Sequence, residues 1–252
     1  MTHEQTTGTD QSFILNRFGY FIAILTTGLT ALTFGIALMT PPLSGPFCTE
    51  GCYEYPYSDI ASRFPRDYLW MYPAILLTLV YLIFMVCVYN YAPRDRKLFG
   101  QLGVAFSGIA TLTLVADYFI QLSVIQPSLL NGETDGIALL TQYNPHGIFI
   151  ALEELGYLLM SVSFLFIAFT YSRKDRLEQI SRWVLLAGFW LTVLSLALIS
   201  VTLGIHREYI FELAVISIDW LVLLTIGVLQ SILFKKALRK QALTGERDLA
   251  PV

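Results

Sequence analysis

Six long apolar runs, separated by short polar segments, dominate the pattern of the chain. They cover about residues 18–40, 69–90, 98–126, 147–171, 183–205 and 209–234. Each reaches the roughly 20 residues that a helix needs to cross the hydrocarbon core of a bilayer. The runs are too long and continuous for the alternating strands of about 10 residues that build membrane barrels. The pattern therefore predicts an all-α polytopic membrane protein, a bundle of six transmembrane helices in a single domain over residues 1–252.

Composition supports this class and excludes others. Hydrophobic residues make up 55% of the chain and charged residues 14%, whereas soluble domains carry about a quarter charged residues. The formal net charge is −3 and no basic domain stands apart, which argues against a nucleic-acid partner. The expected partner is the lipid bilayer. The first run exceeds the roughly 7–15 apolar residues of a signal peptide, so we expect it to be a retained helix.

The distribution of lysine and arginine predicts the orientation. Cytoplasmic loops of membrane proteins carry an excess of these residues. One side of the predicted bundle holds 13 of the 16 basic residues, and the other side holds only Arg63, Arg66 and Arg207. We therefore expect a multi-pass protein of the cell (plasma) membrane with both termini in the cytoplasm. The 13 are Arg17, Arg94, Arg96, Lys97, Arg173, Lys174, Arg176, Arg182, Lys235, Lys236, Arg239, Lys240 and Arg247.

The first outer loop, residues 41–68, contains two cysteines in the sequence Cys-Thr-Glu-Gly-Cys. On the outer side disulfides persist, and Gly51 eases the turn that a bridge between Cys48 and Cys52 requires. A redox-active dithiol and half of a metal site are the alternatives, although no histidine lies near the pair. The aromatic residues that follow are typical of an interfacial belt, and a lid over a pocket is the second interpretation. In the second outer loop, Asn144 and Pro145 are suited to begin the fourth helix.

Acidic residues inside the apolar runs are the strongest functional signal. An ionisable side chain in lipid costs a few kcal/mol or more, so it is expected to face the bundle interior, water or a partner. No lysine or arginine lies within the interior of any run to neutralise these residues. The five carboxylates are Asp117, Glu153, Glu154, Glu212 and Asp219.

Helical spacing assigns these carboxylates to polar stripes. Residues three, four or seven apart share a helix face, and at ~1.5 Å rise per residue four of the carboxylates fall in the outer half and the fifth near the midplane. Glu154 points about 100° away from its neighbour. We expect the stripes to line one outward-facing acidic cavity in which Asp117, Glu153 and Asp219 approach one another. The stripes are Asp117 with Gln121, His146 with Glu153 and Tyr157, and Glu212 with Asp219.

Carboxylates crowded in a low-dielectric environment cannot all remain ionised. The most natural function is therefore binding or transport of a proton, a cation or a small cationic solute. The first alternative is an intramembrane enzyme that acts on a lipid or amphipathic substrate by carboxylate and histidine acid-base chemistry, or through a metal held by His146, Glu153 and Asp117. The second is a non-catalytic sensor or assembly subunit in which the carboxylates only hold helices together. No motif names a cofactor.

The middle of the chain also resembles a known group. The runs Asp117–Gln121, Gln126–Leu130, Tyr143–Gly147 and Glu153–Tyr157, together with Phe64–Tyr68, resemble uncharacterised bacterial multi-pass membrane proteins. The resemblance covers about residues 60–165. It implies a bacterial origin and carries no assigned activity.

Overall fold

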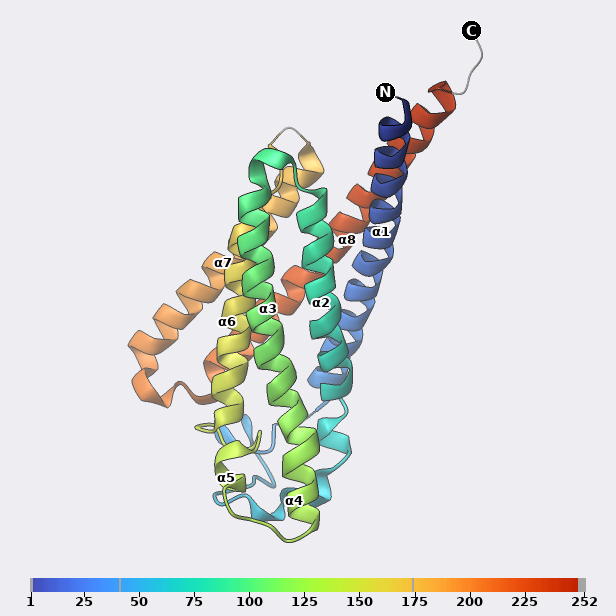
Figure 1. Cartoon of the computed structure of the whole chain (residues 1–252). Helices are drawn as coiled ribbons and strands as arrows, with labels where there is room; N and C mark the ends of the chain where they lie inside the picture. The colour runs from blue at the N-terminus through green and yellow to red at the C-terminus, as the bar shows by residue number, and fades with distance from the viewer. Residues whose placement is uncertain (1, 41, 174, 249–252) are drawn as a thin grey trace.

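The computed structural model describes residues 2–40, 42–173 and 175–248, so Lys174 lies outside the described residues. The molecule is 83% helical, and its described part contains no strand. Six of the described helices are long and apolar enough to cross a membrane, and they form one bundle (Figure 1). The all-α class and the six-helix bundle predicted from the sequence are therefore confirmed.

The long helices agree with the six predicted runs and extend beyond most of them. Short elements connect them: 3₁₀ turns at Gly45–Phe47, Ser58–Arg63, Arg66–Tyr68, Arg94–Arg96 and Gly204–Arg207, and helices α4 (Gln126–Leu130) and α5 (Ile137–Leu140). The long helices are α1 (Thr2–Leu38), α2 (Met71–Tyr91), α3 (Lys97–Ile120), α6 (Ile148–Ala168), α7 (Arg176–Leu203) and α8 (Glu208–Asp248).

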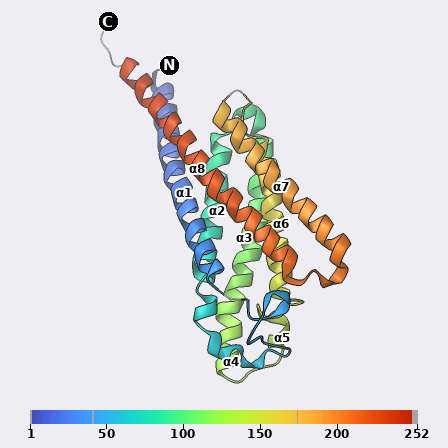
Figure 2. The same cartoon turned by 180° about the vertical axis from the view of Figure 1, so that it is seen from behind.

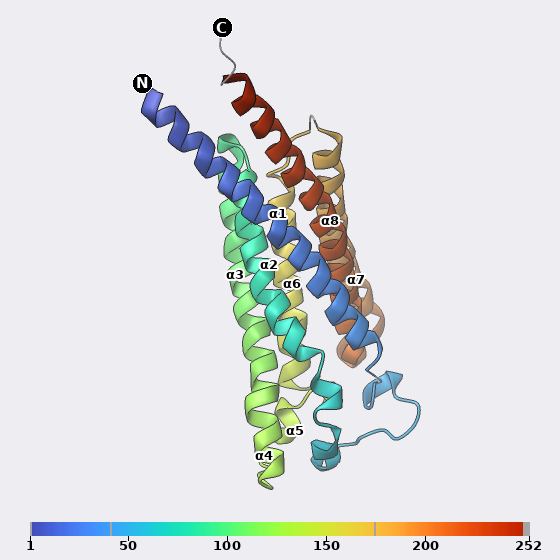
Figure 3. The same ribbon diagram turned by 90° about the vertical axis from the view of Figure 1, so that its right-hand side faces the viewer.

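Helices α3 and α6 pack most extensively against each other. Helices α1 and α8 pack side by side along another flank of the bundle (Figures 2 and 3). Helix α7 is peripheral. Its side chains Leu198 and Val201 are exposed to the surroundings, as expected for a helix with one face in lipid. The described ends of α1 and α8 lie at the same end of the bundle (Figure 1). An even number of spans requires that arrangement, whereas which end faces the cytoplasm stays a prediction.

The sequence predicted that the third helix ends near Gln126, but the helix continues beyond this residue. A π-helical segment over Gln121–Ile125 follows α3, and α4 then continues to Leu130. Proline normally breaks a helix because it lacks an N–H group and its ring clashes with the preceding turn. The wider π turn just before Pro127 loosens that backbone, so the helix passes the proline and extends the third span.

The fourth helix begins later than its capping residues indicated. Helix α6 starts at Ile148 with Gly147 at the N-cap and no side-chain cap. The Asn144 side chain instead accepts a hydrogen bond from the N–H of His146 at 2.9 Å. This local turn satisfies the backbone before the helix begins, so the interpretation of Pro145 as the first helical residue was wrong.

Candidate functional site

A pocket of about 440 Å³ lies between the outer-loop ends of α1, α6 and α8. "Outer" here means the end of the bundle that carries the loops 41–68 and 127–147. Apolar side chains form most of the wall, and they come from α1, from α8, from the first outer loop and from Trp70 just before α2. Carboxyl and hydroxyl groups form the remainder. We call the part formed by Glu153 and Glu212 the acidic floor. The apolar wall includes Phe34, Leu38, Trp70, Leu213, Ile216 and Trp220.

The acidic floor consists of two glutamates from different helices. Glu153 of α6 is 0% exposed and Glu212 of α8 is 8% exposed. Their carboxyl groups lie within hydrogen-bonding reach of each other. Such a contact needs a proton on one of the two groups, because an ionised carboxylate can only accept. The pair is therefore built to share a proton.

Two tyrosines hold one edge of this pair. The Tyr118 hydroxyl donates to Oε1 of Glu153 at 2.6 Å and lies 3.0 Å from the Tyr157 hydroxyl. Oε2 of Glu153 accepts no hydrogen bond from the described residues. Within the described residues neither Glu153 nor Glu212 forms an ion pair. The carboxyl group of Glu153 is therefore held by a neutral hydroxyl donor and not by a positive charge.

Asp117 joins this group from α3. It is buried, and it interacts electrostatically with both Glu153 and Glu212. Its Oδ2 atom has no hydrogen-bond partner in the described part of the chain. Asp117 does not line the pocket, so it adds a third carboxyl group behind the acidic floor.

Asp219 does not line the pocket, although the sequence analysis expected it to approach Asp117 and Glu153. Its Oδ1 atom lies 2.6 Å from the Ser161 hydroxyl, which in turn lies 2.8 Å from the Thr192 hydroxyl. Tyr157 interacts with both Glu153 and Asp219. The polar stripes of α6 and α8 do face each other, but Asp219 pairs with Ser161, four residues beyond Tyr157, and no direct contact joins it to Glu153 in the described residues.

Glu154 has a basic partner, which comes from a loop and not from the interior of a span. Arg207 lies 2.5 Å from Oε2 of Glu154. The Gly204–Arg207 turn between α7 and α8 brings this arginine over the outer part of α6. Sequence spacing within one helix does not reveal which loop reaches it, so only the tertiary structure could identify this ion pair.

Gln121 and His146 lie outside the pocket. The Gln121 amide donates to the carbonyl oxygen of Leu140 at 2.5 Å and accepts from the N–H of Gln142 at 3.1 Å, so it holds the second outer loop. The His146 side chain is exposed and forms no pair with Glu153. Among the described residues no group of three or more potential ligands is arranged to hold a metal ion.

The sequence analysis missed a polar cluster at the outer rim. Asp67 is buried, lines the pocket, and accepts hydrogen bonds from Arg63 Nε and the Tyr143 hydroxyl, both at 2.8 Å. The hydrogen bond to Asp67 raises the pKa of Arg63, and burial raises the pKa of Tyr143. The acidic residue within the Phe-Pro-Arg-Asp-Tyr run was the only available signal for this cluster.

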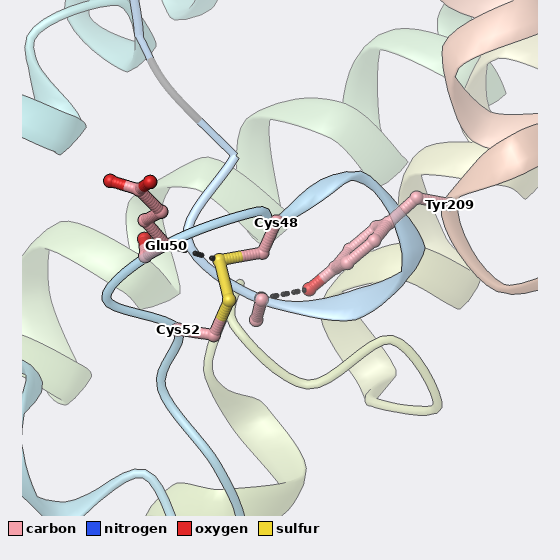
Figure 4. The surroundings of a disulfide bond; sticks show 5 residues. Cys48, Glu50, Cys52 and Tyr209 are labelled. Carbon is pink, nitrogen blue, oxygen red and sulfur yellow. Dashed lines mark hydrogen bonds between the residues drawn. A yellow bond between two sulfur atoms is a disulfide. The ribbon is translucent and has the colours of Figure 1, made fainter.

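The disulfide between Cys48 and Cys52 is confirmed. The loop that carries it packs against the start of α8, where Tyr209 points toward it (Figure 4). The Ser44 and Tyr209 hydroxyls are 2.8 Å apart. At Gly45, φ is +67°, and a Cβ atom there would lie 2.4 Å from the Tyr209 ring. Only glycine fits this approach, so the loop is closely packed on α8.

Comparison with protein-family models, with curated proteins and with solved structures finds no match to this chain. The resemblance to bacterial membrane proteins therefore stays a prediction. The function proposed below rests on the geometry of the pocket.

Proposed function

We propose that this integral membrane protein binds a cationic solute in the outer pocket and exchanges it for the proton shared by Glu153 and Glu212. The observation that carries the proposal is the carboxyl pair itself. It lines a pocket, it is buried, and no lysine or arginine neutralises it within the described residues. A charge buried in a membrane protein needs a partner, and here a proton or a cation must supply it.

The carboxyl pair holds a proton in one state and a cation in the other. With the proton in place the carboxyl groups hydrogen-bond to each other. When a cation enters, both carboxylates can ionise around it, and the proton leaves. Binding should therefore strengthen as the pH rises and release up to one proton for each cation bound. Most lysines and arginines lie on the side of the predicted bundle opposite the pocket. Because these residues favour the cytoplasmic side, we expect the pocket to face the outer side of the plasma membrane.

The non-catalytic alternative predicts no pocket, and the enzyme alternative uses a carboxylate with a histidine partner, or a metal. Neither His146 nor His206 lines the pocket. The polar groups of the lining are three carboxyls, those of Asp67, Glu153 and Glu212, together with several hydroxyls and one amide. This arrangement favours reversible binding of a cation over acid-base catalysis by a carboxylate and a histidine.

Tryptophan fluorescence in lipid nanodiscs tests the proposal. Trp70 and Trp220 line the pocket, and Trp183 and Trp190 lie exposed on α7. Replacing the α7 pair by phenylalanine leaves reporters only at the pocket. We expect an alkylammonium probe, either methylammonium or octylammonium, to change this fluorescence and to release protons into a weakly buffered solution.

The decisive variant is Glu153→Gln, which keeps the side-chain shape and removes the charge. We expect the affinity for the probe to fall at least tenfold and proton release to disappear. The matched control is Glu133→Gln, on an exposed outer-loop residue that does not line the pocket. If Glu153→Gln fails to fold, Glu212→Gln removes the other half of the pair. Equal binding of both probes by the wild type and a folded variant would refute the function.

A further inference from the structure

The pocket opens toward lipid. Leu38, the last residue of α1, and Leu213, in the second turn of α8, both line it. Leu38 is nevertheless 74% exposed and Leu213 is 46% exposed. Both residues belong to helices that are apolar enough to cross a bilayer. The space between the ends of α1 and α8 therefore opens where the outer leaflet surrounds the bundle, and we call it the lateral mouth.

The first outer loop covers the pocket on the side away from the bilayer. Thr40, Leu43, Ser44 and Phe47 contribute to the lining from above. Three contacts hold this cover in place: the Ser44–Tyr209 hydrogen bond, a hydrogen bond of 2.8 Å from the N–H of Tyr53 to the carbonyl oxygen of Leu43, and the Cys48–Cys52 disulfide. A solute that comes from the water must displace this cover, whereas one that comes from the leaflet does not.

The lining is polar at one end and apolar at the other. The carboxyls of Glu153 and Glu212 form the inner floor, and Phe34, Ile216 and the two leucines of the lateral mouth form the apolar side. A charged head that forms ion pairs with the floor leaves its apolar part against α1 and α8. A pocket of about 440 Å³ is within the size range of sites for small organic ligands. A hydrated inorganic ion would leave most of this apolar wall in contact with water.

We propose that the occupant of the pocket is an amphipathic amine that enters from the outer leaflet through the lateral mouth between α1 and α8. The inference rests on the proposed function, because the acidic floor is the same carboxyl pair. It adds the chemical class of the solute, an ammonium group on a hydrocarbon chain, and its route. Apolar burial contributes about 0.8 kcal/mol per CH₂ group, so affinity should increase with chain length.

A series of primary alkylammonium ions, from methyl through butyl to octyl, tests the chemical class. All carry the same head group. Nanodiscs that contain wild type or Glu153→Gln are compared at equal lipid content, which removes the contribution of simple partition into lipid. We expect octylammonium to bind the wild type at least a hundredfold more tightly than methylammonium, and the neutral octanol not to compete for the site.

Equal affinity along the series would overturn the inference and leave the proposed function intact, because charge-dependent binding would remain. Competition by octanol that equals the competition by octylammonium would also overturn it, since the acidic floor would then contribute nothing. Loss of all charge-dependent binding is a different result, and it refutes the proposed function.

Substitutions at the lateral mouth test the route. Leu38→Trp and Leu213→Trp place a bulky ring at the entrance, and radiolabelled octylammonium measures the rate of association. Leu32→Trp and Leu221→Trp are the matched controls, because these leucines are exposed on the same two helices and do not line the pocket. We expect at least fivefold slower association in the first pair only. If instead all four variants bind at the wild-type rate while reduction of Cys48–Cys52 accelerates binding, the solute enters through the outer loop and the lateral route is wrong.

Discussion

At the scale of single residues, Asp175 shows how one exposed carboxylate serves two helices. It is the N-cap of α7, where its Oδ1 atom accepts from the N–H of Leu177 at 2.9 Å. Its other oxygen forms an ion pair with Lys236 of α8. The hydrogen bond from Lys236 contributes most to lowering the pKa of Asp175, and the backbone hydrogen bonds at the cap add to it. The ionised form of Asp175 therefore stabilises the folded protein.

This lowered pKa predicts a pH-dependent contribution to stability. Because the folded pKa lies below the ordinary value of about 3.9, the contribution is present above that value and is lost as the pH falls through the folded pKa. Asp175→Asn keeps an oxygen for the cap and removes the charge. We expect it to lower stability by a few tenths of a kcal/mol at pH 7, as for other exposed ion pairs. The deficit should shrink as the pH falls below about 3.9 and vanish once the pH is below the folded pKa, since both proteins are then neutral at this site.

Thermal unfolding followed by circular dichroism from pH 3 to pH 7 measures the difference. Asp135→Asn is the control, because this exposed loop residue forms no ion pair within the described part of the chain. A deficit that stays constant over the whole pH range would mean that the charge of Asp175 does not contribute.

At the scale of elements, the contact between α3 and α6 depends on glycines. A Cβ atom on Gly156 would lie 2.6 Å from both Cγ and Cδ2 of Leu114, and one on Gly103 would lie 2.6 Å from Cγ1 of Ile167. Leu114 and Ile167 are fully buried. Small residues let membrane helices approach closely, and this approach improves their packing. The close approach also brings Asp117 and Tyr118 of α3 near Glu153 of α6, so the same glycines help to assemble the acidic floor.

Gly156→Ala should therefore destabilise the bundle. Overpacking of a well-packed interior typically costs about 1–3 kcal/mol, and Leu114 is fully buried. Gly108→Ala is the matched control on α3, because a Cβ atom there meets nothing within 4 Å. We expect the first variant to melt several degrees below the wild type in a thermal-shift assay and the control to melt at or above it. The packing argument fails if the two variants melt at the same temperature.

At the scale of the whole molecule, the orientation of the bundle in the membrane determines which side of the membrane the pocket faces. The described chain ends, the basic connection 92–97 and the start of α7 lie at one end of the bundle, and the loop 42–68 lies at the other (Figure 1). The pocket and the disulfide lie at the end that carries this loop. Because lysine and arginine favour the cytoplasmic side, we expect the pocket to face outward.

Labelling of single cysteines in intact cells measures this sidedness. Asp135→Cys lies in the second outer loop and Asp95→Cys lies between α2 and α3, and both positions are exposed. A membrane-impermeant thiol reagent should label the first in intact cells and the second only after permeabilisation. Cys87 is buried and Cys48 is bonded to Cys52, so neither should react under non-reducing conditions. The opposite labelling pattern would place the pocket on the cytoplasmic side.

The sequence by itself determined the six spans, the disulfide and most of the buried carboxyl groups. The bilayer imposes a length of about 20 apolar residues on each helix, and the high cost of an ionisable group in lipid makes residues such as Glu153 and Asp219 conspicuous. Helix periodicity also placed Glu153 and Tyr157 on one face, as the structure has them. These are local or one-dimensional properties, so a single chain is enough to reveal them.

Only the tertiary structure decided which side chains meet. Glu153 faces Glu212, whereas Asp219 pairs with Ser161, because the crossing of α6 and α8 sets the level at which their polar stripes touch. Arg207 neutralises Glu154, and Tyr143 reaches Asp67, through loops whose paths follow from packing. The lateral mouth likewise depends on where α1 ends relative to α8. Periodicity gives the face of a helix, but the rotation, depth and partner of that face depend on contacts between residues far apart in the chain.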